Sequence, residues 1–178
     1  MTERIHLVGQ LQEAGGRPKN VDLVVNNPED ILVYASDALN RVYERIEAGK
    51  AYYAESPTNS ETITIENPAS SGVKVVIYAI SNPGGGAGAI TYGYDTAAST
   101  SGSVTEINLL TEAADSGASV THQTTQSNPS TVVGSVTPAS SATDPIELAS
   151  PIAISEGDFF QAAHATLSAE VGVYFYEI

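Results

Sequence analysis

The feature that most constrains the fold is an alternation of apolar and polar residues that begins near position 55 and continues to the end of the sequence. Clusters of Gly, Pro, Asn and Ser interrupt it at short, even intervals. A period of two residues is typical of half-buried β-strands, and these clusters are typical of turns. We expect strands at 61–67, 73–81, 89–96, 103–110, 118–125, 130–136, 146–154, 159–165 and 170–178.

Many short strands without a helical pattern between them predict an all-β domain. At 178 residues, the chain is long enough for one domain with a core of its own. We therefore expect residues 55–178 to form an antiparallel β-sandwich or barrel of eight to nine strands. The Ser-, Thr- and Ala-rich stretches at 97–103 and 137–143 are predicted to be surface loops.

Residues 1–54 follow a different pattern, and we expect them to form an N-terminal arm and one amphipathic helix. The arm has apolar stretches at 5–11 and 21–25, and the segment 13–20 between them is rich in residues that favour flexibility. The first ten residues lack a basic stretch followed by an apolar one, so the sequence predicts no signal peptide.

The helix is predicted from its capping residues and from its spacing. Asn27 suits the N-cap, Pro28 suits the first helical position, and Gly49 suits the C-terminal end. Helical spacing places on one face Ile31, Ala35, Ala38, Leu39, Val42 and Ile46. The tail of this segment, 42–55, has an extended alternative, because its Tyr and Val residues favour strands.

A glycine-rich segment raises the possibility of a nucleotide-binding loop. Gly84, Gly86 and Ala89 fit the spacing G-x-G-x-x-A, which in dinucleotide-binding proteins joins a strand to a helix. The helix is needed because its N-terminus holds the pyrophosphate. Here the following segment, 89–96, alternates like a strand. We therefore predict a turn that joins it in a hairpin to the strand at 73–81, and no bound cofactor.

The charge of the chain excludes some partners. The sequence has 21 acidic and 7 basic side chains, a formal net charge of −14, and its last Lys or Arg is Lys74. A surface without cations cannot neutralise phosphates, so we expect neither nucleic-acid binding nor insertion into an anionic membrane. Either this acidity simply keeps the protein soluble, or it reflects life in concentrated salt, where charge repulsion is screened. We favour the second interpretation.

The usual residues of metal and catalytic sites do not form motifs in this sequence. The chain has no cysteine, and its histidines, His6, His122 and His164, have no metal-binding spacing. We predict that His122 and His164 are ordinary strand residues. Serines are numerous, but none lies in a G-x-S-x-G motif. A triad assembled from distant residues stays open, because triads are defined by geometry.

Two pairs of acidic residues invite a glycosidase or calcium-site interpretation. Glu29 and Asp30 are explained by the start of the helix, where carboxylates complement the dipole. Glu156 and Asp158 flank a glycine, which is typical of a turn between strands. Neither pair has the alternating oxygen ligands of a calcium loop, and only a weak surface cation site stays open.

Tyrosines recur at alternating strand positions, and these could form a surface on which sugars stack. The alternative is ordinary packing, which we favour because aromatic residues are common in strands. The tyrosines concerned are Tyr52, Tyr53, Tyr78, Tyr92, Tyr94, Tyr174 and Tyr176.

Several stretches together resemble virion structural proteins of double-stranded DNA viruses, with and without tails. The resemblance covers residues 44–178 and rests on turn and strand patterns. These are ERIEAGKAYYAE, ETITIENPASSGVKVVIYAIS, ITYGYDT, SVTEINLLTEAADSGASVTHQTT and PIAISEGDFFQAAHATLSAEVGVYFYEI. It implies an eight-stranded jelly roll that tiles or decorates a capsid, often around a three-fold axis. Combined with the acidity, it implies a virus of a halophilic archaeon.

Our leading hypothesis is a non-enzymatic capsid or capsid-decoration subunit in the virion. It would bind copies of itself, as a homotrimer or a larger lattice, and other virion proteins. Contacts are expected through residues 1–50 and the loops 82–88, 97–103 and 137–145. No basic arm is present, so this chain is not expected to package the genome, and we assign no catalytic, cofactor-binding or metal-binding residue.

Two other hypotheses belong to different classes. The first is a receptor- or glycan-binding module of a tail or spike, which predicts a concave cluster of tyrosines. The second is a hydrolase of sandwich fold, which predicts that a histidine and a carboxylate meet in a cleft.

Overall fold

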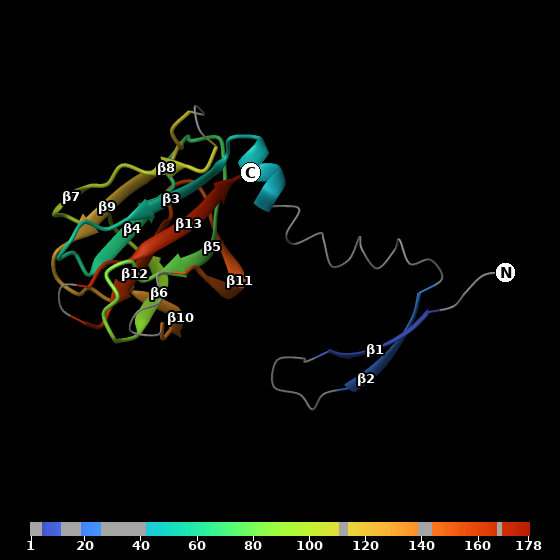
Figure 1. Ribbon diagram of the computed structural model, residues 1–178. Helices are drawn as coiled ribbons and strands as arrows, with labels where there is room; N and C mark the ends of the chain where they lie inside the picture. The colour runs from blue at the N-terminus through green and yellow to red at the C-terminus, as the bar shows by residue number, and fades with distance from the viewer. Residues whose placement is uncertain (1–4, 12–18, 26–41, 111–113, 139–143, 167–168) are drawn as a thin grey trace. The chain divides into compact units, whose positions relative to one another are not determined.

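The computed structural model describes residues 5–11, 19–25, 42–110, 114–138, 144–166 and 169–178. The chain divides into two compact units, Met1–Glu44 and Arg45–Ile178 (Figure 1). From the sequence we set the division after residue 54, which falls within the first strand of the C-terminal unit.

The N-terminal unit contains a two-stranded antiparallel sheet. Strands β1 (Ile5–Leu11) and β2 (Lys19–Val25) pair along their whole length, from Ile5 opposite Val25 to Leu11 opposite Lys19. The sequence showed both apolar stretches but not that they pair.

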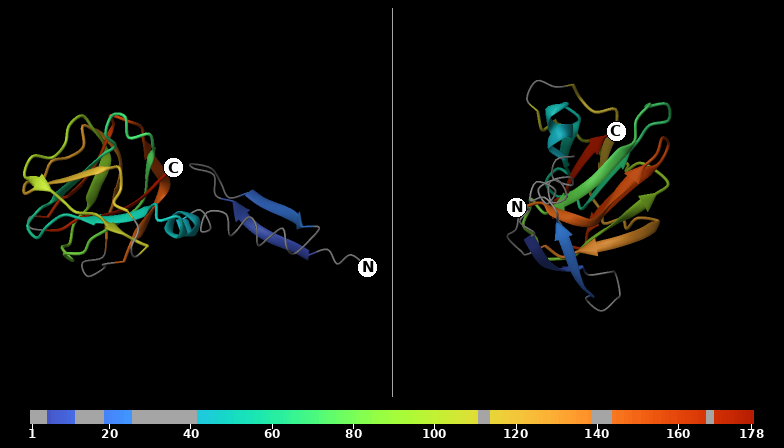
Figure 2. Two further views of the ribbon diagram at one scale, coloured as in Figure 1. Left: turned by 90° about the horizontal axis from the view of Figure 1, so that it is seen from above. Right: turned by 90° about the vertical axis from the view of Figure 1, so that its right-hand side faces the viewer.

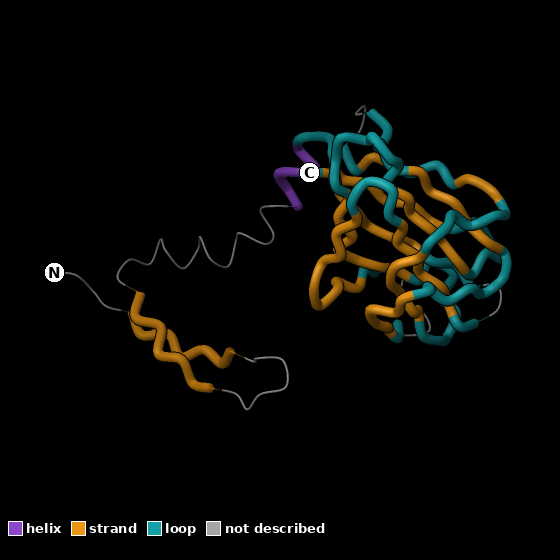
Figure 3. Tube along the Cα trace, turned by 180° about the vertical axis from the view of Figure 1, so that it is seen from behind, coloured by secondary structure: helices purple, strands orange, loops and turns teal. Residues whose placement is uncertain are grey.

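The predicted helix is described only at its end. Residues 26–41, which hold most of it, lie outside the described residues, whereas 42–47 are helical (Figure 3). Gly49 has a φ of 67°, and its N–H donates to the Ile46 carbonyl at 2.9 Å. A left-handed glycine at this point ends the helix, as predicted. The segment 51–55 is a strand. Within the tail 42–55, the predicted helix is therefore correct for 42–47 and the extended alternative is correct for 51–55.

The C-terminal unit consists of two antiparallel sheets that form the two layers of a sandwich (Figures 1 and 2). This confirms the predicted all-β architecture. The five-stranded sheet has the order β11 (Ile146–Ile154), β5 (Val75–Ser81), β13 (Gly172–Glu177), β3 (Ala51–Glu55) and β8 (Ile107–Asn108). The six-stranded sheet has the order β10 (Thr131–Val136), β6 (Ile90–Asp95), β12 (Phe159–His164), β4 (Thr62–Glu66), β9 (Ser119–Gln123) and β7 (Gly102–Ser103).

Eight of the nine predicted segments contain one strand each, and two predictions were wrong. The segment 103–110 is not one strand, because β7 and β8 lie in different sheets. The strands β5 and β6 do not form a hairpin either, since β5 pairs with β11 and β13 while β6 pairs with β10 and β12. The segment between them crosses from one layer to the other. Alternation identifies strands but does not identify their partners.

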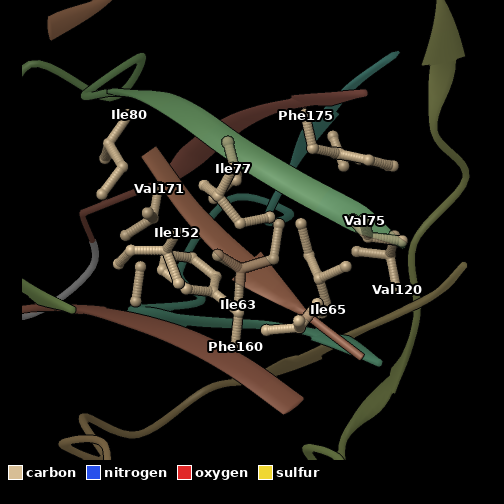
Figure 4. Packing of buried hydrophobic residues seen from close by; sticks show 14 of the residues in the cluster. Ile63, Ile65, Val75, Ile77, Ile80, Val120, Ile152, Phe160, Val171 and Phe175 are labelled. Atoms are coloured by element: carbon tan, nitrogen blue, oxygen red, sulfur yellow. The ribbon is translucent and has the colours of Figure 1, made fainter. Parts of the chain in front are cut away.

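The hydrophobic core lies between the two sheets (Figure 4). Ile63 and Phe160 come from the six-stranded sheet, Ile77 and Phe175 come from the five-stranded sheet, and all four are fully buried. Burying a side chain of this size contributes roughly 1.5–3 kcal/mol. This core fixes which residues of each strand point inward, and therefore which are presented on the outer faces.

Candidate functional site

Four tyrosines gather on the outer face of the five-stranded sheet. Tyr53 of β3 is paired with Tyr174 of β13, and their ring centroids lie 4.6 Å apart. Tyr78 of β5 lies 6.1 Å from the ring of Tyr174 and 5.8 Å from that of Tyr176. All four side chains are partly exposed. We call Tyr53, Tyr78, Tyr174 and Tyr176 the tyrosine face.

The alternation of β3 and β13 explains why these rings point outward. Tyr52 and Phe175, next to them in sequence, point into the core and stack with ring centroids 5.4 Å apart. Tyr78 joins the outer group through a β-bulge, because Tyr174 pairs with Ala79 and the next residue, Phe175, pairs with Ile77. The extra residue in a bulge redirects its side chain. The sequence placed Tyr78, Tyr174 and Tyr176 on strands and left Tyr52 and Tyr53 between a helix and an extended alternative. It did not separate the inner ring from the outer ones.

Polar groups lie at one end of the tyrosine face. The Tyr53 hydroxyl donates a hydrogen bond to Glu55 Oε2 at 2.6 Å. The Ser81 hydroxyl is buried and approaches Tyr53 and Tyr174, but it forms no hydrogen bond of good geometry with any described residue. Gly172 lies between these groups, and a Cβ there would come within 2.6 Å of the Tyr53 hydroxyl. The glycine therefore lets the Tyr53 and Ser81 hydroxyls pack closely against β13.

The phenols of Tyr53, Tyr78 and Tyr174 keep their protons at neutral pH. Burial raises the pKa of Tyr78 to about 12. Burial and the hydrogen bond to Glu55 raise the pKa of Tyr53 further. The pKa of Tyr174 is also raised, mainly by burial, with smaller contributions from the carboxylates of Glu55 and Asp144. The face thus presents uncharged hydroxyl groups beside carboxylates.

A second surface lies at the edge of the six-stranded sheet. Strand β10 is its outermost strand and pairs with β6 alone among the described strands. Val132 and Val133 are 56% and 51% exposed, and Tyr94 of the neighbouring strand is 38% exposed. A bulge between Val132 and Gly134 leaves Val133 outside the ladder. We call Val132, Val133 and Tyr94 the β10 edge. In the sequence, this edge is marked only by the adjacent Val132 and Val133, which break the alternation of apolar and polar residues.

Two of the three histidines lie on described strands of the sandwich, His122 on β9 and His164 on β12. His164 is fully buried, which lowers its pKa, and its Nδ1 accepts a hydrogen bond from the Thr166 N–H at 2.9 Å. The backbone N–H of His164 donates to the backbone carbonyl of Glu61, a residue that is 4% exposed. His122 Nδ1 lies 3.0 Å from the Ser60 hydroxyl. His6 falls on β1, whose side chains the structure does not describe.

A shallow, open depression lies elsewhere on the surface. Its described lining contains no histidine and consists of Gly72, Val73, Lys74, Ser155, Glu156 and Ile178. Glu156 accepts hydrogen bonds there from the N–H groups of Gly72 and Ser70, at 2.8 and 3.2 Å. Its carboxylate therefore ties two turns together.

The second acidic pair forms a turn, as predicted. Asp158 Oδ2 accepts a hydrogen bond from the Ser155 N–H at 3.2 Å, and Gly157 has a φ of 82°. Glu29 and Asp30 lie outside the described residues. Within the described ranges, no three or more His, Asp or Glu residues form a group able to hold a metal ion.

The glycine-rich segment is a turn, as predicted, although it joins two sheets. Gly85 has a φ of 67°, and the Asn82 side chain donates to the Gly86 carbonyl at 2.8 Å. The Thr166 hydroxyl donates to the Ala87 carbonyl. Strand β6 follows, so the helix N-terminus that a dinucleotide loop needs is missing from this described segment.

Comparison of the chain with protein-family models, curated proteins and solved structures finds no match. No helix in the described part of the chain is long and apolar enough to cross a membrane. The functional argument therefore rests on the two surfaces and on the strand order.

Proposed function

We propose that this protein is a non-enzymatic virion structural protein, a capsid or capsid-decoration subunit whose body is a jelly roll and which assembles by self-association. Its partners would be copies of itself and other virion proteins, and its location the virion. The net charge of −14 supports a virus that lives in concentrated salt, with a halophilic archaeon as host.

The strand order is the observation that carries this proposal. Taken along the chain, the long strands after the helix are β3, β4, β5, β6, β10, β11, β12 and β13, with β9 set aside. The first pairs with the last (β3 with β13), the second with the seventh (β4 with β12), the third with the sixth (β5 with β11), and the fourth with the fifth (β6 with β10).

This pairing is that of one long hairpin folded over into two sheets. The strands β7, β8 and β9 form an insertion between the fourth and fifth strands of that hairpin and extend the edges of both sheets. A double-sheet arrangement of eight strands is the jelly roll, which occurs in viral capsid proteins and in lectins. The strand order thus supports the jelly roll that the sequence resemblance implies.

The β10 edge supports assembly. The outermost strand of a sheet presents N–H and C=O groups that another strand can pair with, and proteins usually protect such edges with lysine, proline or very short strands. The opposite edge of this sheet is the two-residue strand β7, whereas β10 has six residues and two exposed valines. We propose that β10 contacts a second copy of the chain.

The segments that the sequence analysis assigned to subunit contacts stay part of the proposal. They are residues 1–50 and the loops 82–88, 97–103 and 137–145, of which 139–143 lie outside the described residues. The N-terminal unit suits this role, because an isolated two-stranded sheet is only marginally stable in water and gains from a partner.

Size-exclusion chromatography with light scattering in multimolar salt tests the proposal. We expect the wild-type chain to form an oligomer. The double substitution Val132→Lys and Val133→Lys places charges on the edge and should shift the equilibrium toward the monomer. Ile107→Lys is the matched control, since Ile107 is 61% exposed on β8 at an edge of the other sheet. A wild-type protein that stays monomeric at high concentration would overturn the proposal.

The sequence analysis also considered a receptor- or glycan-binding module. The tyrosine face is the observation that favours this second function. The tyrosine face and the β10 edge lie on different sheets, so ligand binding can accompany assembly in one protein.

A further inference from the structure

We propose that the tyrosine face binds an uncharged saccharide, with a pyranose ring stacked on Tyr174 and its hydroxyl groups bonded to Glu55 and Tyr53 at one end of the face. This binding site goes beyond the assembly role and does not depend on it.

The first argument is the continuity of the aromatic surface. The outer face of an antiparallel sandwich is normally solvated and polar. Here the rings of three neighbouring strands, β3, β13 and β5, lie within 4.6–6.1 Å of one another, and Tyr174 is the ring that contacts both Tyr53 and Tyr78. Cross-strand aromatic pairs do stabilise sheets, but these rings also stay partly exposed. The apolar C–H face of a sugar ring matches such a surface.

The second argument is the placement of polar groups at the end of the rings. Binding sites for small molecules combine apolar walls with a few well-placed polar groups. Glu55 is a hydrogen-bond acceptor, and the uncharged phenol of Tyr53 donates to it. Saccharide hydroxyls both donate and accept, so they satisfy this mixed set.

The third argument is the close approach of polar groups at Gly172. A side chain at this position would overlap the Ser81 hydroxyl and come within 2.6 Å of the Tyr53 hydroxyl. Gly172 pairs with Glu55 on one side and with Ser81 on the other, so it lies at the centre of the polar end. The missing side chain lets the Tyr53 and Ser81 hydroxyls pack against the backbone of β13, which holds the Tyr53 hydroxyl beside Glu55.

The fourth argument is the charge around the tyrosine face, which distinguishes between anionic, cationic and neutral ligands. Glu55 and Asp144 act on Tyr174, and the whole chain carries a net charge of −14. Anionic ligands such as sulfated sugars, sialylated sugars and nucleic acids are therefore repelled. Organic cations are attracted to carboxylates and aromatic rings, but that attraction weakens as salt screens it. The affinity for a neutral saccharide does not depend on charge attraction, so it should change little with salt.

Intrinsic tyrosine fluorescence and saturation-transfer NMR test the site, and fluorescence is informative because the chain has no tryptophan. The ligands are neutral oligosaccharides of glucose, galactose and mannose, titrated against the full chain. We expect at least one to bind, and we expect Tyr174→Ala to weaken it about tenfold, because the central ring is lost. Tyr174→Phe keeps the ring and should weaken binding less. Tyr94→Ala, on the other sheet, should leave it unchanged.

Several results would overturn this proposal. They are the failure of all neutral oligosaccharides to bind at millimolar concentration, equal affinity of wild type and a folded Tyr174→Ala variant, and stronger binding of sulfated sugars. Preferential binding of a lysine-rich peptide that disappears in high salt would overturn it too. Thermal unfolding of each variant verifies its fold, and light scattering on the same samples reports assembly separately. A failure of saccharide binding is thereby distinguished from a failure of the proposed function.

Discussion

The β10 edge and the tyrosine face both expose apolar side chains, yet they differ in what their backbones offer. Strand β10 has a neighbour on one side only, whereas β13, at the centre of the tyrosine face, is paired with β3 and β5. An edge can donate and accept main-chain hydrogen bonds, but a central strand cannot. The β10 edge therefore suits another strand, and the tyrosine face suits a ligand that brings its own hydroxyl groups.

A second difference is the kind of side chain. Aliphatic valines at the β10 edge gain from any dry contact, because burying their surface is non-directional. The tyrosines have rings with a preferred stacking geometry and hydroxyls that need partners. This comparison teaches that one sandwich can keep assembly and ligand recognition apart, on different sheets. The predictions below test that separation.

The largest effect is expected from Gly93→Ala, which acts on the β10 edge alone. A Cβ at Gly93 would overlap the Thr131 carbonyl oxygen and lie 2.9 Å from the Val133 nitrogen, so β10 must move away from β6. Overpacking of this kind costs about 1–3 kcal/mol of the free energy of unfolding. Denaturant unfolding should show this loss, and light scattering should show reduced assembly.

Gly117→Ala is the control for that substitution. Its new Cβ would meet Glu177 Oε1 at 3.4 Å, an ordinary contact. It should change the free energy of unfolding much less than Gly93→Ala. Equal effects of the two substitutions, or a Gly93→Ala variant that loses saccharide binding while it keeps assembly, would contradict the separation of the two surfaces.

Salt should act differently on the two surfaces. Raising the ionic strength from about 0.1 M to about 1 M shortens the Debye length from about 10 Å to about 3 Å. Chains that each carry a net charge of −14 then no longer repel one another strongly. We expect assembly to increase clearly with salt, as measured by light scattering. Affinity for a neutral saccharide should change little. Assembly that weakens in high salt would argue against an apolar contact between like-charged subunits.

The smallest effect is expected from alkaline titration. Tyr78 has a pKa of about 12 in the folded protein, against 10.0 for an unperturbed tyrosine. Because the folded pKa is the higher one, this residue contributes stability in full below pH 10 and loses it as the pH rises from 10 toward 12. Absorbance of the phenolate should therefore show a late transition that Tyr78→Phe reduces. A titration of all phenols near pH 10 in the folded protein would contradict the partly buried tyrosine face.

The sequence predicted the strands well where alternation was regular. It located β4, β5, β6 and β9 to β13 because turn residues separate each of them from the next. It did not predict strand pairing, and the expected hairpin across residues 82–88 was wrong because each of the two strands finds its partners in its own sheet. Pairing depends on contacts between distant parts of the chain, which periodicity does not record.

The candidate site was predictable only in part. The sequence identified the tyrosines but favoured ordinary packing for all of them. Whether Tyr52 or Tyr53 points inward is set by which face of β3 meets the core, and the outward direction of Tyr78 comes from a bulge. Neither is encoded in the local sequence. The exposure of Val132 follows from the outermost position of β10, which only the complete strand order reveals.

Electron microscopy of the purified protein in multimolar salt tests most directly whether this sandwich is an assembly unit. The account predicts closed oligomers or a lattice in which β10 of one copy lies against a neighbouring copy, with the tyrosine face left open to solvent. Single, unassociated sandwiches at high protein concentration, or oligomers in which β10 faces solvent and the tyrosines form the contact, would contradict it.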